Sequence, residues 1–246
     1  MPGKLGEGLK YAEEAYANAK ATSSKYYASL GRTVSARVIN FADPGRAVAI
    51  ALEATVLARE SGAPRPIARA YEALGEARYE SGAYREARAA YEQGLSVPNP
   101  SEMAFIAPEL EYMLALTCLK LGDLTAARHH AEAARGGAVK EDVHASGLAL
   151  AALAAVSGRE GNADDAEGLF KQALEIIDAT AYRERSAFIR ELFAEFLLSQ
   201  GRAAEARPLL EWAHDFYAEP VLVRRRARIE ALLAQCVSAA TTGSGA

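Results

Sequence analysis

The chain has 246 residues, of which 50% are hydrophobic and 24% charged, and its formal net charge is −4. This composition supplies enough apolar side chains for a large buried core and excludes a disordered chain. The mild acidity offers no electrostatic surface for nucleic acid, and no apolar run approaches the roughly 18 residues that a membrane-spanning helix needs. The N-terminal segment also lacks the apolar core of a secretory signal, so we expect a cytoplasmic protein without a nucleic-acid or membrane partner.

Helical periodicity, interrupted by glycine and proline, predicts an all-α chain. The pattern begins with a single helix over residues 5–21 and ends with a single helix over residues 221–239. Between them it predicts five helix pairs: 24–41 with 44–61, 64–81 with 84–97, 103–121 with 124–136, 140–158 with 162–178, and 182–200 with 203–218. We expect one repeat domain over residues 1–240, followed by a flexible tail over residues 241–246.

Three series of small residues recur every 39 or 40 residues along the chain. The first series lies in the second helix of each pair: Gly8, Ala47, Ala87, Ala127, Ala166 and Ala206. The second follows seven residues later: Ala15, Ala54, Gly94, Ala134, Ala173 and Ala213. The third lies in the first helix of each pair: Ser35, Gly75, Ala115, Ala154, Ala194 and Ala234. Because antiparallel helices approach closely only where side chains are small, these series predict stacked helix pairs.

One repeat carries a more specific pattern, with large and small residues at fixed places: Tyr71, Leu74, Gly75, Gly82, Tyr84, Ala87, Tyr91 and Pro98. In this spacing residues 68–98 resemble a tetratricopeptide repeat (TPR). The later repeats keep only the turn glycine, the small residues and one or two large apolar positions. The period exceeds the family's usual 34 residues and resembles its long-helix variants in bacterial regulators and kinesin light chains. The resemblance implies a right-handed superhelical solenoid with a concave face, about five pairs plus a half-repeat helix at each end.

Few side chains suit catalysis or metal binding. His129 and His130 point about 100° apart on a helix, and neither has a second His or Cys three or four residues away. Cys118 and Cys236 are expected to be buried thiols rather than a disulfide. The basic stretch over residues 223–230 is expected to be a solvated face paired with nearby carboxylates rather than a nucleic-acid contact. We therefore predict no enzyme activity, no metal and no cofactor.

The resemblance also implies that the first helix of each pair lines the concave face. Its inward positions are apolar in the central repeats and charged in the flanking ones, which suits a peptide or helix with an apolar anchor. The predicted groove residues are Arg32, Arg69, Glu72, Glu76, Tyr79, Tyr112, Leu116, Phe188, Glu191, Glu195 and Arg228. Tyrosines and glutamates in this set are expected to face solvent, whereas the alternative for Leu116 is core between neighbouring repeats. The family's peptide-terminus clamp of lysines and asparagines is missing at these positions.

Two hypotheses on function follow. The first is a non-enzymatic scaffold that binds a peptide or helix of a partner protein in the groove. The alternative is a ligand-sensing module of a bacterial transcription regulator or signal-transduction ATPase, in which a small-molecule effector changes the superhelix pitch. The unpaired first helix indicates either an irregular N-terminal cap or a segment of a longer protein, and the sequence leaves both open.

Overall fold

The computed structural model describes residues 5–98, 100–138, 142–218 and 222–243, and every regular element in these ranges is helical. Most predicted helix boundaries are confirmed to within three residues. The helices are α1 (Leu5–Ala21), α2 (Lys25–Asn40), α3 (Pro44–Ser61), α4 (Pro64–Glu80), α5 (Tyr84–Leu95), α6 (Pro100–Met103), α7 (Ala107–Leu121), α8 (Leu124–Gly137), α9 (Val143–Arg159), α10 (Ala163–Asp178), α11 (Arg183–Ser199), α12 (Ala203–Phe216) and α13 (Val223–Gly243).

Two boundaries differ from the prediction. The helix expected over residues 103–121 is preceded by the short α6 and starts only at Ala107, with Pro108 in the first turn of α7. Proline is tolerated there because its missing N–H has no partner inside the helix. The tail expected over residues 241–246 is helical as far as Gly243, and residues 244–246 lie outside the described part.

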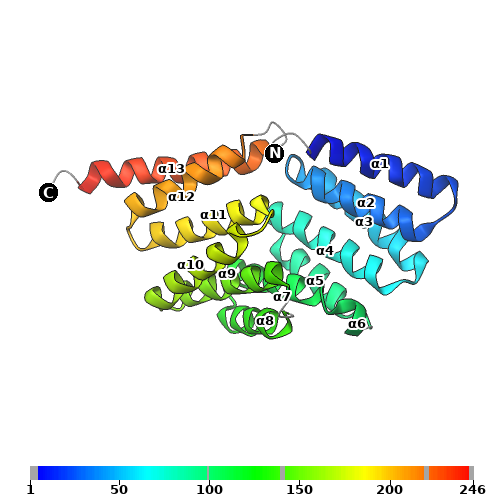
Figure 1. Ribbon diagram of the computed structural model, residues 1–246, viewed down its shortest axis with the longest axis horizontal. Coiled ribbons are helices and arrows are strands. Elements are labelled where there is room, and N and C mark those ends of the chain that lie inside the picture. Colours follow the sequence, from blue (N-terminus) through cyan, green and yellow to red (C-terminus); the bar gives the residue numbers. More distant parts are fainter. Residues whose placement is uncertain (1–4, 99, 139–141, 219–221, 244–246) are drawn as a thin grey trace.

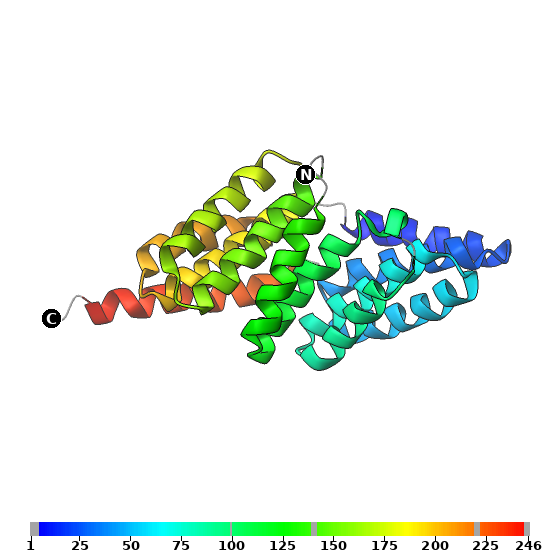
Figure 2. The same ribbon diagram turned by 90° about the horizontal axis from the view of Figure 1, so that it is seen from below.

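The helices form an arc of stacked antiparallel pairs (Figures 1 and 2). The first helices of the pairs, α2, α4, α7, α9 and α11, continue into α13 and form the inner layer. The second helices form the outer layer, which starts with α1. The arc curves enough that α11 and α13 lie opposite α4 across the inside (Figure 1). No helix in the described residues is long and apolar enough to cross a bilayer.

In the five helix pairs the recurring small residues are buried where the helices pack together. Ala47, Ala87, Ala127, Ala166 and Ala206 are completely buried. At Gly75 an added Cβ would lie 2.3 Å from Cε1 of Tyr91, so only glycine lets this buried ring pack flat against α4. The turn glycines after α4 and α7, Gly82 and Gly122, have φ values of 81° and 79°, which favour glycine. The predicted register is therefore confirmed for the five helix pairs. It is wrong for the terminal helices, because Ala15 and Ala234 are exposed and α1 buries Ala12 and Ala19 instead.

Leucine at either of two small positions, Ala87 and Ala166, is expected to lower the free energy of unfolding by about 1–3 kcal/mol. Both alanines are fully buried, so the larger side chain has to push paired helices apart. Chemical denaturation of Ala87→Leu and Ala166→Leu measures the effect, with Ala204→Leu at an exposed position of α12 as the control. Unchanged midpoints in both core variants would contradict the register.

Candidate functional site: the inner face

The inner face of the arc is closed by side chains and is not an open groove. Tyr79 and Tyr112 are only 4% and 2% exposed, and Glu72 and Glu191 are 1% and 0% exposed. The prediction that these four residues face solvent is therefore wrong. The reason is the curvature: α11 and α13 approach α4 and α7, so the inner residues of the early and late repeats fill the space between them.

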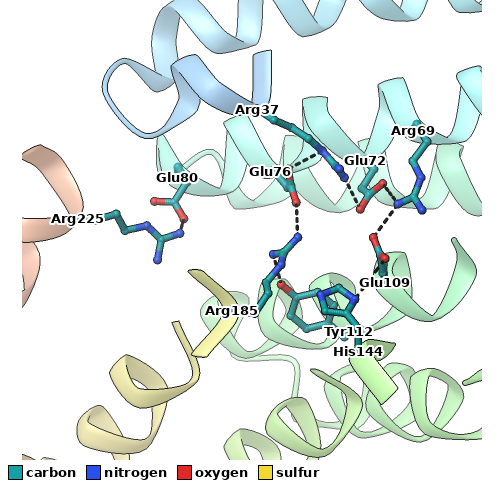
Figure 3. Close-up of polar contacts among 10 residues, drawn as sticks. All are labelled: Arg37, Arg69, Glu72, Glu76, Glu80, Glu109, Tyr112, His144, Arg185 and Arg225. Carbon is teal, nitrogen blue, oxygen red and sulfur yellow. Dashed lines mark hydrogen bonds and ion pairs between the residues drawn. The ribbon is translucent and has the colours of Figure 1, made fainter. Parts of the chain in front are cut away.

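Two arginines form ion pairs with glutamates of α4 on this face (Figure 3). Arg37 of α2 places Nη2 2.5 Å from Oε1 of Glu72 and Nε 3.3 Å from Oε2 of Glu76. Arg69 donates from Nη1 to Glu72, at 2.8 Å, and to Glu109 of α7, at 2.7 Å. Glu72 thus lies between two guanidinium groups. Burial disfavours its charge, but Arg37 and Arg69 outweigh burial and lower the pKa of Glu72 to about 2.

Arg185 of α11 reaches across the inside of the arc (Figure 3). Its Nη1 donates to Oη of Tyr112, at 3.1 Å, and its Nη2 lies 3.7 Å from Oε1 of Glu76. Glu76, which was expected to face solvent, is therefore held between Arg37 and Arg185, with its side chain 14% exposed. Arg185 joins α11 to both α4 and α7.

The arginines of α13 close the other side. Arg225 pairs with Glu80 of α4 and with Oε2 of Glu191, the latter at 3.2 Å. Arg228 places Nε 2.6 Å from Oε1 of Glu191 and Nη2 2.6 Å from Oε1 of Glu195. The basic stretch over residues 223–230 is therefore explained mainly by inward ion pairs and is solvated only in part. Glu80 and Arg225 are 145 residues apart, so this pair ties an early repeat to the last inner helix.

An apolar pocket of about 220 Å³ remains on the inner face, where α4, α7, α9 and α11 meet. Its apolar lining is Tyr79, Leu116, Leu119, Ala155, Gly158, Phe170, Leu192 and Phe196. The charged lining is Lys120, Arg159 and Glu195. The pocket exists because Ala155 and Gly158 of α9 are small and leave space between the larger leucine and phenylalanine side chains of α7 and α11. At Gly158 an added Cβ would lie 2.7 Å from Cδ2 of Phe196, so the glycine also lets this ring take its place in the wall.

Two charged cavities flank Arg185 and share Arg37 and Glu184 in their lining. One, of about 190 Å³, adds Glu80, Tyr112 and Arg225, and the other, of about 450 Å³, adds further polar groups, among them His144. The Nε2 atom of His144 is buried without a hydrogen-bond partner. The larger cavity therefore has an unsatisfied polar group in its lining.

The predicted groove residues divide into three groups. Most line a cavity: Arg69, Glu76, Tyr79, Tyr112, Leu116, Phe188, Glu195 and Arg228. Glu72 and Glu191 are instead enclosed by ion pairs and line none of the cavities described above. Arg32 is misplaced, because it faces the outer layer, where it pairs with Glu13 and Glu53. Phe188 and Leu116 are 6% and 3% exposed, so both also belong to the core.

Several inner residues were missed from the sequence. Arg37, Lys120, Arg159 and Arg185 were not predicted, and Arg225 was noticed only as part of a basic stretch. Each has its partner or cavity on another repeat. Their position depends on the curvature of the whole arc, which no local pattern encodes.

The remaining sequence candidates have local explanations. Cys118 and Cys236 are buried free thiols, as predicted. His129 is exposed, whereas His130 is half-buried with its Nδ1 2.6 Å from Oε2 of Glu111, so only the first is the solvated histidine expected. In the part of the chain that the structure describes, no group of three or more His, Cys, Asp or Glu side chains could hold a metal ion.

The protonation of Glu109 is expected to make stability depend on pH. Burial, and next the nearby Glu72 carboxylate, raise its pKa to about 7, above the value of about 4.3 in an unfolded chain. The folded state therefore binds the Glu109 proton more tightly than the unfolded state does. The stability that protonated Glu109 contributes is fully present below about pH 4.3 and is lost as the pH rises through about 7. Glu109→Gln cannot ionise. Relative to the wild type it should gain on the order of 1–3 kcal/mol of unfolding free energy between about pH 5 and about pH 8.

Denaturation curves of both proteins across that range measure the difference. Glu175→Gln on α10 is the control, since Glu175 is exposed and lies outside the cluster. A difference between Glu109→Gln and wild type that does not change with pH would contradict the raised pKa.

Comparisons with known proteins bear on the fold. No family model and no curated protein matches the sequence. Similar solved structures include the following three. YrrB, described as a TPR protein with an unusual peptide-binding site, is 18% identical, with 87% of this chain and 98% of YrrB covered and a TM-score of 0.45. A chain of the APC/C hetero-tetramer Cut9–Hcn1 is 12% identical. The match covers 96% of this chain and 44% of the Cut9–Hcn1 chain, with a TM-score of 0.62. A TPR protein from Parabacteroides merdae is 15% identical. The match covers 94% of this chain and 99% of that protein, with a TM-score of 0.44.

The chain spans less than half of the Cut9–Hcn1 chain that it matches, and at this identity the likeness concerns the fold alone. This similarity of fold agrees with the two-layer arc of antiparallel pairs and with the spacing of small residues between paired helices. The chain therefore has the TPR-like helical repeat fold.

Proposed function

We propose that this chain is a non-enzymatic binding module that holds a bulky apolar side chain of a partner protein or peptide in the apolar pocket. The observation that carries the proposal is the apolar pocket itself, of about 220 Å³, on an inner face whose other cavities have charged linings. An apolar side chain that enters it is removed from water, and such buried anchors supply most of the energy of peptide recognition.

The form of the partner follows from the closed inner face. Because Arg185 and Arg225 span the inside of the arc, a long helix cannot lie along the whole inner layer in this conformation. A short extended segment or a loop can still reach the pocket from the solvent side, where Arg159 is exposed. The proposal therefore favours a short segment over a docked helix. It also treats α1 to α13 as one domain, which the Glu80–Arg225 pair supports.

Filling the pocket tests this function. Ala155 is half-buried and lines the pocket, so Ala155→Phe should occupy the space while leaving the helix pairs in place. We expect proteins that wild type retains from a cell extract to be lost with Ala155→Phe, and the identified partner to bind at least about tenfold more weakly. Ala204→Phe, on the outer layer, is the matched control. Equal binding by Ala155→Phe and wild type would place the partner elsewhere.

A second candidate function, the sensing of a small polar ligand, is supported by the charged cavities beside Arg185. A molecule there would contact α2 and α11 together and so alter the link between early and late repeats. Native mass spectrometry of the purified protein tests this candidate. A bound mass present in wild type and lost in Arg185→Ala supports it, and a bare protein mass in both counts against it.

A further inference from the structure

The positive charges around the apolar pocket outnumber the negative ones. Lys120, Arg159 and Glu195 line it together with the apolar residues. Arg159 is exposed and makes no ion pair within the described ranges of the chain. Lys120 has one carboxylate near it, Glu195, and the distance from Nζ to Oε2 is 3.9 Å.

Glu195 is already neutralised from another side. Its Oε1 accepts a hydrogen bond from Nη2 of Arg228, at 2.6 Å, which is far shorter than its distance to Lys120. Charge-assisted hydrogen bonds of that length are the stronger ones, so Glu195 is mainly the partner of Arg228. The pocket therefore has two cations, from α7 and α9, that lack a close carboxylate of their own.

We propose that the partner segment carries an acidic side chain next to its apolar anchor, and that Lys120 and Arg159 recognise it. This inference rests on the proposed function and specifies the chemistry of the partner. The apolar side chain is removed from water in the pocket and supplies most of the affinity. The two cations stay partly solvated, so a carboxylate beside them contributes chiefly to selectivity and association rate, and its effect weakens with salt.

Selection from a random short-peptide library displayed on phage tests the inference directly. Wild type should enrich peptides in which Asp or Glu lies within a few residues of Leu, Phe or another large apolar residue. The double variant Lys120→Glu, Arg159→Glu should lose this acidic preference and enrich Lys or Arg beside the same apolar residue. A peptide selected on wild type should bind the double variant at least about tenfold more weakly, because attraction becomes repulsion.

The matched control changes the net charge equally on the outer layer. Arg85 of α5 and Arg135 of α8 are both exposed, so Arg85→Glu, Arg135→Glu should select the same peptides as wild type. Lys120 and Arg159 also lie in the last turns of their helices, where a cation complements the helix dipole. If that were their whole role, charge reversal would lower the melting temperature and leave the selected peptides unchanged, which would overturn the inference.

The outcomes separate this inference from the function beneath it. If the selected peptides are apolar, lose binding to Ala155→Phe and show no preference for Asp or Glu, only the role of Lys120 and Arg159 is overturned. Peptides that bind wild type and Ala155→Phe equally, or a selection that enriches nothing, overturn the proposed function and this inference with it.

Discussion

Glu191→Ala is expected to lower the free energy of unfolding by about 2–4 kcal/mol. The carboxylate is fully buried between Arg225 and Arg228, with distances of 3.2 Å and 2.6 Å to their guanidinium nitrogens. Removing one member of a buried ion pair typically costs about 3–5 kcal/mol, because the remaining charge is left unpaired. Here the cost is smaller, since Arg225 keeps Glu80 and Arg228 keeps Glu195.

Chemical denaturation and small-angle X-ray scattering together measure this effect. We expect a lower midpoint and a larger radius of gyration, because Glu191 also helps to hold α13 against α11. Glu205→Ala removes an exposed partner of Arg202 and is the control, with little expected change. A Glu191→Ala protein that is as stable and as compact as wild type would show that the inner ion pairs do not hold the arc closed.

The helices and their register could be predicted because their signals are local. Glycine at the turns and proline in first turns act on the local backbone, and the small residues of the five pairs act between neighbouring helices. Gly75 shows this well: its lack of a side chain is required by Tyr91, sixteen residues away in the same pair. The sequence pattern and the packing therefore report the same contact.

The state of the inner face could not be predicted, because it depends on how small rotations add up over successive repeats. Tyr112 illustrates the error. As a groove residue it was expected to face solvent, yet it is buried and its hydroxyl accepts a hydrogen bond from Arg185, 73 residues later in the chain. No pattern within one repeat connects two such residues. Burial of Tyr112 now makes Tyr112→Ala a destabilising change and a poor probe of binding.

The apolar pocket was anticipated in part. Tyr79, Leu116 and Glu195 were predicted as groove residues and do line it. The sequence placed an apolar centre on the inner face correctly, because inward positions recur with the helical period. It could not show that ion pairs would close the rest of that face and leave this pocket among the few openings toward the inside.

Removal of residues 222–246 is expected to cause self-association and to lower the melting temperature by on the order of 10 °C. These residues contain α13, whose Ile229 and Cys236 belong to the same buried cluster as Leu210 and Ala213 of α12. Without α13 the apolar face of the last pair is exposed to water, and exposed apolar faces drive association. The truncation also removes Arg225, so the tie between α13 and α4 is lost.

A shorter truncation provides the control. Removing residues 239–246 leaves both inward arginines in place, together with Leu222, Ile229 and Cys236, the buried residues of the stretch 222–238. That protein should match wild type in light scattering and melt close to it, while the longer truncation forms larger species at the same concentration. If the protein without residues 222–246 is instead of the same size class as wild type and equally stable, α13 does not cap the apolar face of α12, and the ion pairs of Arg225 and Arg228 contribute nothing to holding the arc together.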